Sequence, residues 1–124
     1  MLGIHESVHV KDNQFWVCAP TEKHLVKLKL RGYNVTHDNT EVGKNCSLIF
    51  VCVKPNTVRM VCHDNTEVVK NCSLIFVCVK PISVRILCSE IGSNLTEEQL
   101  LVSVAAGVRI ADLKMVSGDR VVFI

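Results

Sequence analysis

The side chains best suited to chemistry in this sequence are those of seven cysteines and five histidines. Thiolates and imidazoles bind zinc, and paired thiols can form disulfides. No two of the cysteines have the Cys-x-x-Cys spacing that is typical of structural zinc sites. His5 and His9 would share one face of a helix, but no further ligand lies near them in the sequence. The pattern therefore predicts solvated histidines and no metal site.

Six of the cysteines are three positions that occur twice. Residues 37–62 are repeated as residues 63–88, and the copies differ only at Gly43/Val69, Asn56/Ile82, Thr57/Ser83, Met60/Ile86 and Val61/Leu87. Cys52 and Cys78 are the same position in the two copies, and each lies in an apolar run. A free thiol in such a run behaves as a small hydrophobic group. We therefore expect core or surface thiols and neither a disulfide nor a metal ligand.

Each copy contains an apolar run that a Lys-Pro pair ends, Leu48–Val53 in the first and Leu74–Val79 in the second. Apolar residues without alternation are typical of a strand buried on both faces of a parallel sheet. A buried helix is the alternative, but the Lys-Pro pairs end the runs too early for one. Two copies are too few for a solenoid, so the repeat predicts a duplication inside one domain.

The bulk properties are those of a globular protein. A chain of 124 residues with 48% hydrophobic and 21% charged residues is expected to form a single domain, residues 1–124, with its own core. The net charge of +2 is small and the charges are interspersed, so the sequence predicts no nucleic-acid or membrane partner. The N-terminal residues lack the pattern of a signal peptide, which predicts a cytoplasmic, intracellular location.

The other segments alternate between expected strands and helices. A helix between Thr21, a good N-cap, and Gly32 is expected to carry one apolar face. Thr96 and Gln99 have the spacing of a capping box. This alternation indicates an α/β fold with a mostly parallel sheet. The expected strands are Phe15–Cys18, Tyr33–Thr36, Leu100–Ala105 and Val121–Ile124, the apolar face is Leu25, Val26, Leu28 and Leu30, and further helices are expected at Val84–Ile91 and around Ile110 and Leu113.

Several of these segments resemble the N-terminal, dinucleotide-binding domain of pyrroline-5-carboxylate reductase. The resemblance covers about residues 14–114 once one repeat copy is set aside. Its most specific pieces are Val79-Lys80-Pro81 with the strand before it, and Val104 to Gly107 after Leu100–Ser103. It implies a Rossmann-like, three-layer α/β domain, incomplete at both ends. It also implies an oxidoreductase of proline biosynthesis that reduces a cyclic imine, with NADP or NAD as its cofactor.

The resemblance also implies which residues bind the cofactor. Cys18, Ala19 and Pro20 end the second strand of the family fold, where the adenine ribose and its phosphate are bound. Asn39 and its copy Asn65 match an asparagine that reaches the cofactor ribose. Val53, Lys54 and Pro55, with their copies Val79, Lys80 and Pro81, match a loop whose backbone lines the cofactor. Ala105, Ala106 and Gly107 match the turn beside the nicotinamide. No catalytic side chain is implied, because imine reduction depends on positioning the hydride donor and the substrate.

Each of these residues also has a purely structural explanation. Asn39 and Asn65 could serve only as helix caps, and the Lys-Pro pairs could serve only to end strands. Residues 105–107 could form only a tight turn between a strand and a helix. The resemblance, and not the residue chemistry alone, favours the cofactor-binding role.

Two features of the family are not found among these residues. The family's glycine fingerprint lays the pyrophosphate on a helix N-terminus, but no two of the six glycines here are spaced as G-x-G. The family also continues into a helical domain that forms the dimer and holds the imine, whereas this sequence ends at Ile124. We therefore expect residues 1–124 alone to bind the cofactor weakly, to form no oligomer and not to reduce the imine. The alternative is a non-catalytic nucleotide-binding module, or a fold remnant that packs against another protein.

The resemblance also implies an order of the strands, because in the family sheet the first strand lies centrally, between the second strand and the one that ends in Val-Lys-Pro. Polarity then indicates which segment of this sequence takes that central place. Residues 4–10 carry His, Glu and Ser, which a covered central strand would bury at about 1–3 kcal/mol per unpaired group. Leu48–Val53 carries no such group. We therefore expect the first apolar run in the centre and residues 4–10 outside it. The expected parallel order is 33–36, 15–18, 48–53, 74–79, 100–105.

Overall fold

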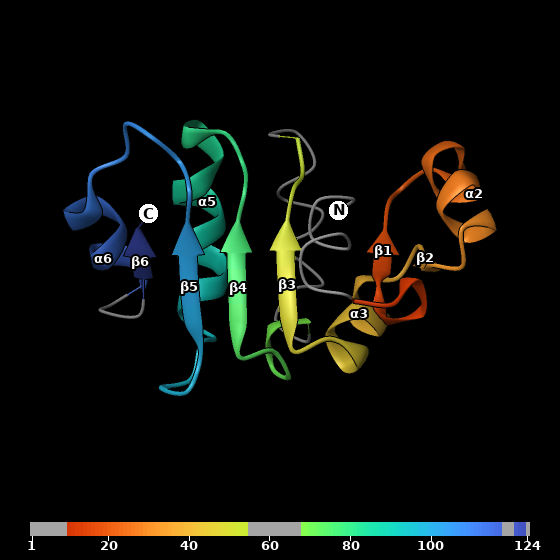
Figure 1. Cartoon of the computed structure of the whole chain (residues 1–124). Coiled ribbons are helices and arrows are strands. Elements are labelled where there is room, and N and C mark those ends of the chain that lie inside the picture. The colour runs from red at the N-terminus through yellow and green to blue at the C-terminus, as the bar shows by residue number, and fades with distance from the viewer. Residues whose placement is uncertain (1–9, 55–67, 118–120, 124) are drawn as a thin grey trace.

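The computed structural model describes residues 10–54, 68–117 and 121–123 (Figure 1). Several residues discussed above lie outside these ranges. They are His5, His9, Pro55, Asn65 and all of the expected strand at residues 4–10 except Val10. The described elements are the 3-10 helix η1 (Asp12–Gln14), β1 (Trp16–Cys18), α2 (Glu22–Leu30), β2 (Asn34–Thr36), α3 (Asn39–Asn45), β3 (Leu48–Val51), β4 (Leu74–Val77), α5 (Pro81–Gly92), β5 (Leu100–Ser103), α6 (Ile110–Ser117) and β6 (Val121–Phe123).

The strands form two parallel sheets. One sheet pairs β1 with β2, and the other has the order β3-β4-β5-β6. Helices follow or precede the strands as the alternating sequence predicts, so the α/β class with a parallel sheet is confirmed. The register of β3 on β4 pairs Leu48 with Leu74 and Val51 with Val77, so each residue lies beside its own copy in the repeat.

The expected continuous sheet is divided in the structure. The order of strands across the molecule is β2, β1, β3, β4, β5, β6, as predicted, but no ladder joins β1 to β3 among the described residues (Figure 1). The three residues of β1 pair with β2, while β3 takes its register from its identical copy β4. The first apolar run is therefore at an edge of the four-stranded sheet and not in its centre.

One face of the four-stranded sheet is buried at β3, β4 and β5 alike. Ile49, Ile75 and Leu101 occupy one row across β3, β4 and β5, and all three are buried in the core. Helix α5 covers this face and contributes a buried stripe to the same core, namely Val84, Leu87, Cys88 and Ile91. Because α5 begins after β4 and returns along the sheet, one helix closes the core over the two central strands (Figure 1).

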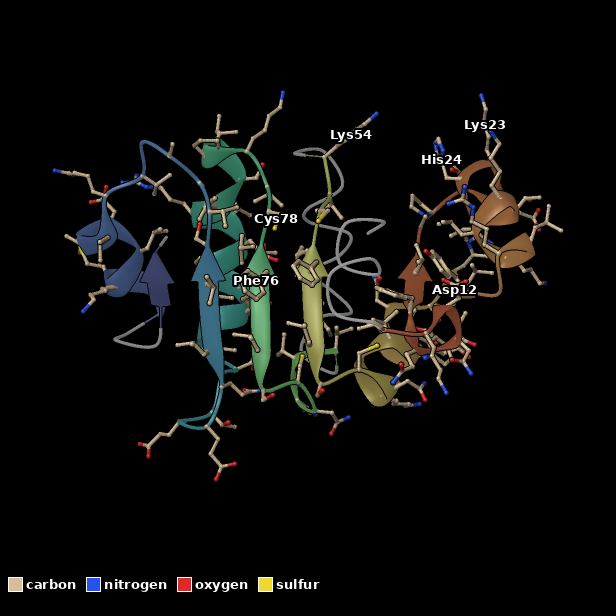
Figure 2. All side chains as sticks on the ribbon, in the orientation of Figure 1. Asp12, Lys23, His24, Lys54, Phe76 and Cys78 are labelled. Atoms are coloured by element: carbon tan, nitrogen blue, oxygen red, sulfur yellow. The ribbon has the colours of Figure 1, made fainter. Side chains whose placement is uncertain are left out.

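The opposite face of β3 differs from the prediction of strands buried on both sides. Leu48 and Phe50 are 44% and 43% exposed, and the Phe50 ring stacks on that of Phe76 with 5.0 Å between centroids. Figure 2 shows Phe76 on the face of β4 turned away from α5. A run of apolar residues predicts a strand, but the burial of each face depends on what packs against it. No helix of the described residues covers this face at β3.

Helix α2 also buries less than its sequence predicts. It begins after Thr21, and Gly32 has a φ of +90° at its C-terminal end, so both predicted boundaries are confirmed. Of its apolar residues only Leu25 is buried, and Leu30 is 84% exposed. The predicted apolar face is therefore wrong in extent, because the two-stranded sheet offers α2 a small surface.

The predicted capping pair before β5 is confirmed. The Thr96 N–H donates to Gln99 Oε1 at 2.8 Å. The buried Gln99 amide also donates to the carbonyl of Cys72 at 2.7 Å and to that of Val69. This side chain therefore satisfies two backbone carbonyls in the turn that leads into β4.

None of the helices within the described ranges is long and apolar enough to cross a bilayer.

One glycine is required by a close backbone approach. Gly43 in α3 is buried, and a Cβ built there would lie 2.5 Å from Val68 Cα. The same repeat position in the second copy is Val69, a buried core residue. The copies differ here because the two positions have different surroundings.

We predict that Gly43→Ala destabilises the protein. Glycine to alanine inside a helix normally stabilises by about 0.5–1 kcal/mol. The clash with the Val68 backbone reverses this sign, since overpacking costs about 1–3 kcal/mol. The urea unfolding midpoint of the variant should fall below that of the wild type. The control is Lys44→Ala, an exposed position in the same helix. A midpoint at or above the wild-type value for Gly43→Ala would contradict the prediction.

Candidate functional site

The candidate site is the edge of the sheets at which the parallel strands end. Strands β1, β3, β4 and β5 all point their carboxyl ends the same way (Figure 1). In open α/β sheets, ligands bind outside this edge, because strand-to-helix loops and helix N-termini gather there. We call this the carboxyl edge, and its described loops are residues 19–21, 37–38, 52–54, 78–80 and 104–109.

Hydrogen bonds tie the ends of β1 and β2 together. The Ala19 N–H donates to the Thr36 carbonyl at 3.4 Å. His37 Nδ1 lies 2.7 Å from the Ala19 carbonyl oxygen, which can only accept, so this ring nitrogen carries the proton. Cys18 is half-buried at the end of β1, and Pro20 is exposed. The loop that carries Cys18, Ala19 and Pro20 is therefore fixed from the neighbouring strand.

The buried Thr36 hydroxyl organises the turn that follows β2. It accepts the Asp38 N–H at 3.0 Å and donates to the Glu41 carboxylate. Asp38 is the N-cap of α3 and accepts the Thr40 N–H at 2.8 Å. Hydrogen bonds from the Thr40 hydroxyl and N–H hold the pKa of Asp38 below its ordinary value. No local pattern predicts the roles of Thr36 and His37, because a lone hydroxyl or imidazole at a strand end is common.

Asn39 is the first residue of α3 and not its cap. Because Asp38 supplies the capping carboxylate, the structural explanation of Asn39 as a cap is wrong. Asn39 is half-buried next to the ends of β1 and β2. Its side chain therefore stands near the carboxyl edge without a capping role.

The two Val-Lys-Pro loops occupy neighbouring positions at the edge. Val53 is half-buried and Val79 buried, and both pack on the core below. Lys54 and Lys80 are exposed, and Lys54 extends away from the end of β3 (Figure 2). Lys80 is the N-cap of α5 with an extended backbone, and Pro81 is the first helical residue. The second loop therefore delivers a helix N-terminus to the carboxyl edge.

The loop after β5 lies next to the second Val-Lys-Pro loop, because β4 and β5 are paired. The Ala105 N–H donates to Ser103 Oγ at 3.3 Å. Ala106 is exposed, and Gly107 has a φ of +78°, which a side chain disfavours. Short side chains thus leave this turn open toward solvent.

The structure brings the predicted residues together in two groups. Val53, Lys54, Val79, Lys80, Pro81 and Ala105–Gly107 lie along the four-stranded sheet, and Cys18–Pro20 and Asn39 lie along the two-stranded sheet. Within the described residues, no group of three or more His, Cys, Asp or Glu side chains could hold a metal ion. The arrangement suits an extended ligand bound by backbone groups, and it offers no set of side chains for acid–base chemistry.

We predict that Thr36→Val destabilises the turn at the candidate site. The substitution keeps the shape but leaves the Asp38 N–H and the Glu41 carboxylate without their partner, at a cost of about 1–3 kcal/mol. The urea midpoint should fall accordingly. The matched control is Thr21→Val, because Thr21 is exposed and makes no side-chain capping hydrogen bond. Equal midpoints for the two variants would refute the role of the Thr36 hydroxyl.

Comparisons with known proteins place this site in context. Residues 58–107 match the model of a family described as NADP oxidoreductase, coenzyme F420-dependent. Over 90% of its length the chain is 29% identical to pyrroline-5-carboxylate reductase 3 of Xenopus laevis and 30% identical to that of Danio rerio. It spans 31% and 30% of these two relatives, about a third of their length.

Two solved structures share the fold. A pyrroline-5-carboxylate reductase from Coxiella burnetii has a TM-score of 0.56 and 20% identity, with 98% of this chain and 37% of that chain covered. The Plasmodium falciparum pyrroline carboxylate reductase, solved with NADP bound, has a TM-score of 0.53 and 19% identity, with 98% and 34% covered. The Rossmann-like fold is thereby confirmed. So is the resemblance that the sequence predicts, to the N-terminal dinucleotide-binding domain of the pyrroline-5-carboxylate reductases.

Proposed function

We propose that this chain supplies the nucleotide-binding part of an NAD(P)H-dependent reductase of the pyrroline-5-carboxylate reductase type. The observation that supports this proposal most directly is that β4 leads through Val79-Lys80-Pro81 into α5. This path lies within residues 58–107, which match an NADP oxidoreductase family. This match supports the second repeat copy, rather than the first, as the cofactor-binding loop.

In this proposal the carboxyl edge holds an extended dinucleotide. The loop Cys18–Pro20 and Asn39 face the adenosine half, and Val79–Pro81 with Ala105–Gly107 face the nicotinamide half. Val53, Lys54 and Pro55 of the first copy, and Asn65, are further candidates for the same contacts. The bound dinucleotide would supply the hydride for reduction of the imine. The chain itself would hold the dinucleotide in position, because the small side chains at residues 105–107 leave room for it beside the turn.

Lys23, close to the end of β1, supports NADP over NAD as the cofactor. It lies in the first turn of α2 together with His24 and the acidic Glu22, three residues after Pro20, and Lys23 and His24 are exposed (Figure 2). A basic side chain after the second strand of a Rossmann fold accommodates the 2′-phosphate of NADP. The Plasmodium falciparum relative was solved with NADP, which agrees with this assignment.

A second candidate function is nucleotide binding without catalysis. The observation that favours it is the absence of a G-x-G spacing among the 124 residues. Backbone N–H groups that meet a pyrophosphate contribute about 1.5–3 kcal/mol each as charge-assisted hydrogen bonds. Losing two of them weakens binding by about 10²–10⁴-fold, because about 1.4 kcal/mol corresponds to tenfold. Both candidate functions therefore predict that the nucleotide binds weakly, and that it binds at the carboxyl edge.

We predict that NADPH binds this edge with an affinity weaker than micromolar. In a titration of ¹⁵N-labelled protein followed by NMR, the amides of Ala19, Lys80 and Ala105 should shift and saturate. The matched controls are the amides of Ser73 and Gln99 at the opposite end of the strands, which should not shift. Shifts confined to the opposite end, or none at the highest NADPH concentration, would refute the proposed site.

Reversing the charge of Lys23 in α2 tests whether this side chain favours NADPH, which carries the 2′-phosphate, over NADH. Lys23→Glu should weaken binding of NADPH by up to about 5-fold, since an exposed charge pair contributes up to about 1 kcal/mol. Binding of NADH, which lacks the 2′-phosphate, should change less. Lys27→Glu, one turn further along the same helix, is the control of equal charge. An equal loss for NADPH and NADH would contradict the assignment of Lys23.

A further inference from the structure

The duplication places two thiols side by side at the carboxyl ends of neighbouring strands. Cys52 and Cys78 are the same repeat position, and each directly follows its strand. The ladder pairs Val51 with Val77, and the Cys78 N–H donates to the Val51 carbonyl at 2.9 Å. The register therefore continues beyond the strands and sets Cys52 beside Cys78.

The spacing of this pair suits a disulfide. Neighbouring strands lie about 4.7–4.9 Å apart, within the Cα–Cα range of about 4.4–6.8 Å that a disulfide spans. Residues paired in register point to the same face of the sheet, so both thiols stand on the face that carries Phe76 (Figure 2). The pKa of Cys52 is raised first by burial and then by the neighbouring Cys78 thiol. This influence of Cys78 agrees with the register, which sets the two side chains next to each other.

Exposure to solvent distinguishes Cys52 and Cys78 from a second pair of cysteines, Cys46 and Cys72. Cys46 and Cys72 are also copies of one position, and burial, followed by the nearby Cys46 thiol, raises the pKa of Cys72 to about 11. Cys72 is only 2% exposed, and its thiol donates to the Val68 carbonyl at 3.6 Å. Cys52 is exposed and Cys78 is half-buried. An oxidant in solution can therefore reach the first pair and not the second.

We propose that Cys52 and Cys78 form a reversible redox-modification site, which a peroxide closes to an intramolecular disulfide. The Cys52 thiol loses its proton to solvent, and the thiolate attacks one peroxide oxygen. The O–O bond breaks, the hydroxide that leaves takes up a proton to become water, and Cys52 becomes a sulfenic acid. The Cys78 thiol likewise loses its proton, and its thiolate attacks the Cys52 sulfur. The S–S bond forms, the S–O bond breaks, and the hydroxide that leaves takes up a proton to become a second water molecule. Both sulfur atoms are oxidised and the peroxide is reduced. A dithiol reagent reverses the reaction by thiol–disulfide exchange.

The disulfide would join the two Val-Lys-Pro loops, because Val53 and Val79 directly follow these cysteines. Closure would fix the spacing of the loops at the carboxyl edge. The oxidation chemistry itself depends only on the thiol pair and not on the proposed nucleotide site, so either proposal can fail without the other.

Peptide mapping of the full chain tests the proposal. The protein is treated with hydrogen peroxide, its remaining thiols are blocked, and it is digested with trypsin. Because trypsin does not cleave before proline, residues 45–59 and 71–85 are released as two peptides whose masses differ at positions 56, 57, 82 and 83. We expect the two peptides to be linked, and dithiothreitol to separate them. The protein should remain monomeric on a non-reducing gel during this reaction.

Single substitutions locate the bond within the linked peptides. Cys52→Ser should lose the linked peptides completely, and Cys46→Ser, the matched change in the other pair, should retain them. If a variant fails to fold, fragmentation of the linked wild-type peptides in the mass spectrometer shows whether Cys52 and Cys78 or Cys46 and Cys72 carry the bond. Linked peptides that persist in Cys52→Ser would overturn the proposal. So would wild-type protein in which peroxide produces only unlinked, singly oxidised thiols or disulfide-joined dimers.

Discussion

The parallel pairing of a strand with its own duplicate is the interaction on which the rest of the structure depends. In a parallel ladder the side chains of paired residues stand on the same face, so every side chain of β3 lies beside an identical one on β4. Ile49 beside Ile75 extends the buried face, and Phe50 stacks on Phe76. Register is strongly specified here, because a slip of one residue would turn the buried isoleucines to the exposed face.

Identical sequences nevertheless have different surroundings in the two copies. Val77 is fully buried and Val51 only half-buried, because β4 has a strand on each side whereas β3 lies at the edge of its sheet among the described residues. The repeat position Gly43/Val69 shows the same asymmetry, since Val69 fills the core and Gly43 admits the Val68 backbone. The copies have therefore acquired different structural constraints at a position where their sequences differ.

The sequence predicts the elements better than their packing. Lys80-Pro81, Thr21 with Gly32, and Thr96 with Gln99 are local signals, and the structure confirms each of them. The exposure of Phe50 and Leu30 and the break between β1 and β3 depend on which surfaces meet, which no local pattern contains. The hydrogen bonds of Thr36 and His37 at the candidate site likewise join segments through the fold. The same limit applies to the cysteines, because only the register places Cys52 beside Cys78.

The pairing also explains how a duplication can leave the carboxyl edge of β4 and β5 in place. The second copy keeps its connections on the other side, since β4 pairs with β5 and leads into α5. The turn at Ala105–Gly107 consequently remains next to Val79–Pro81, as it would without the extra copy. The first copy adds a strand on the far side of β4, where the ladder accepts an identical partner and the β4–β5 pairing is undisturbed. A parallel sheet tolerates such an insertion at low cost, because the new strand is built from a sequence that already pairs well with its neighbour.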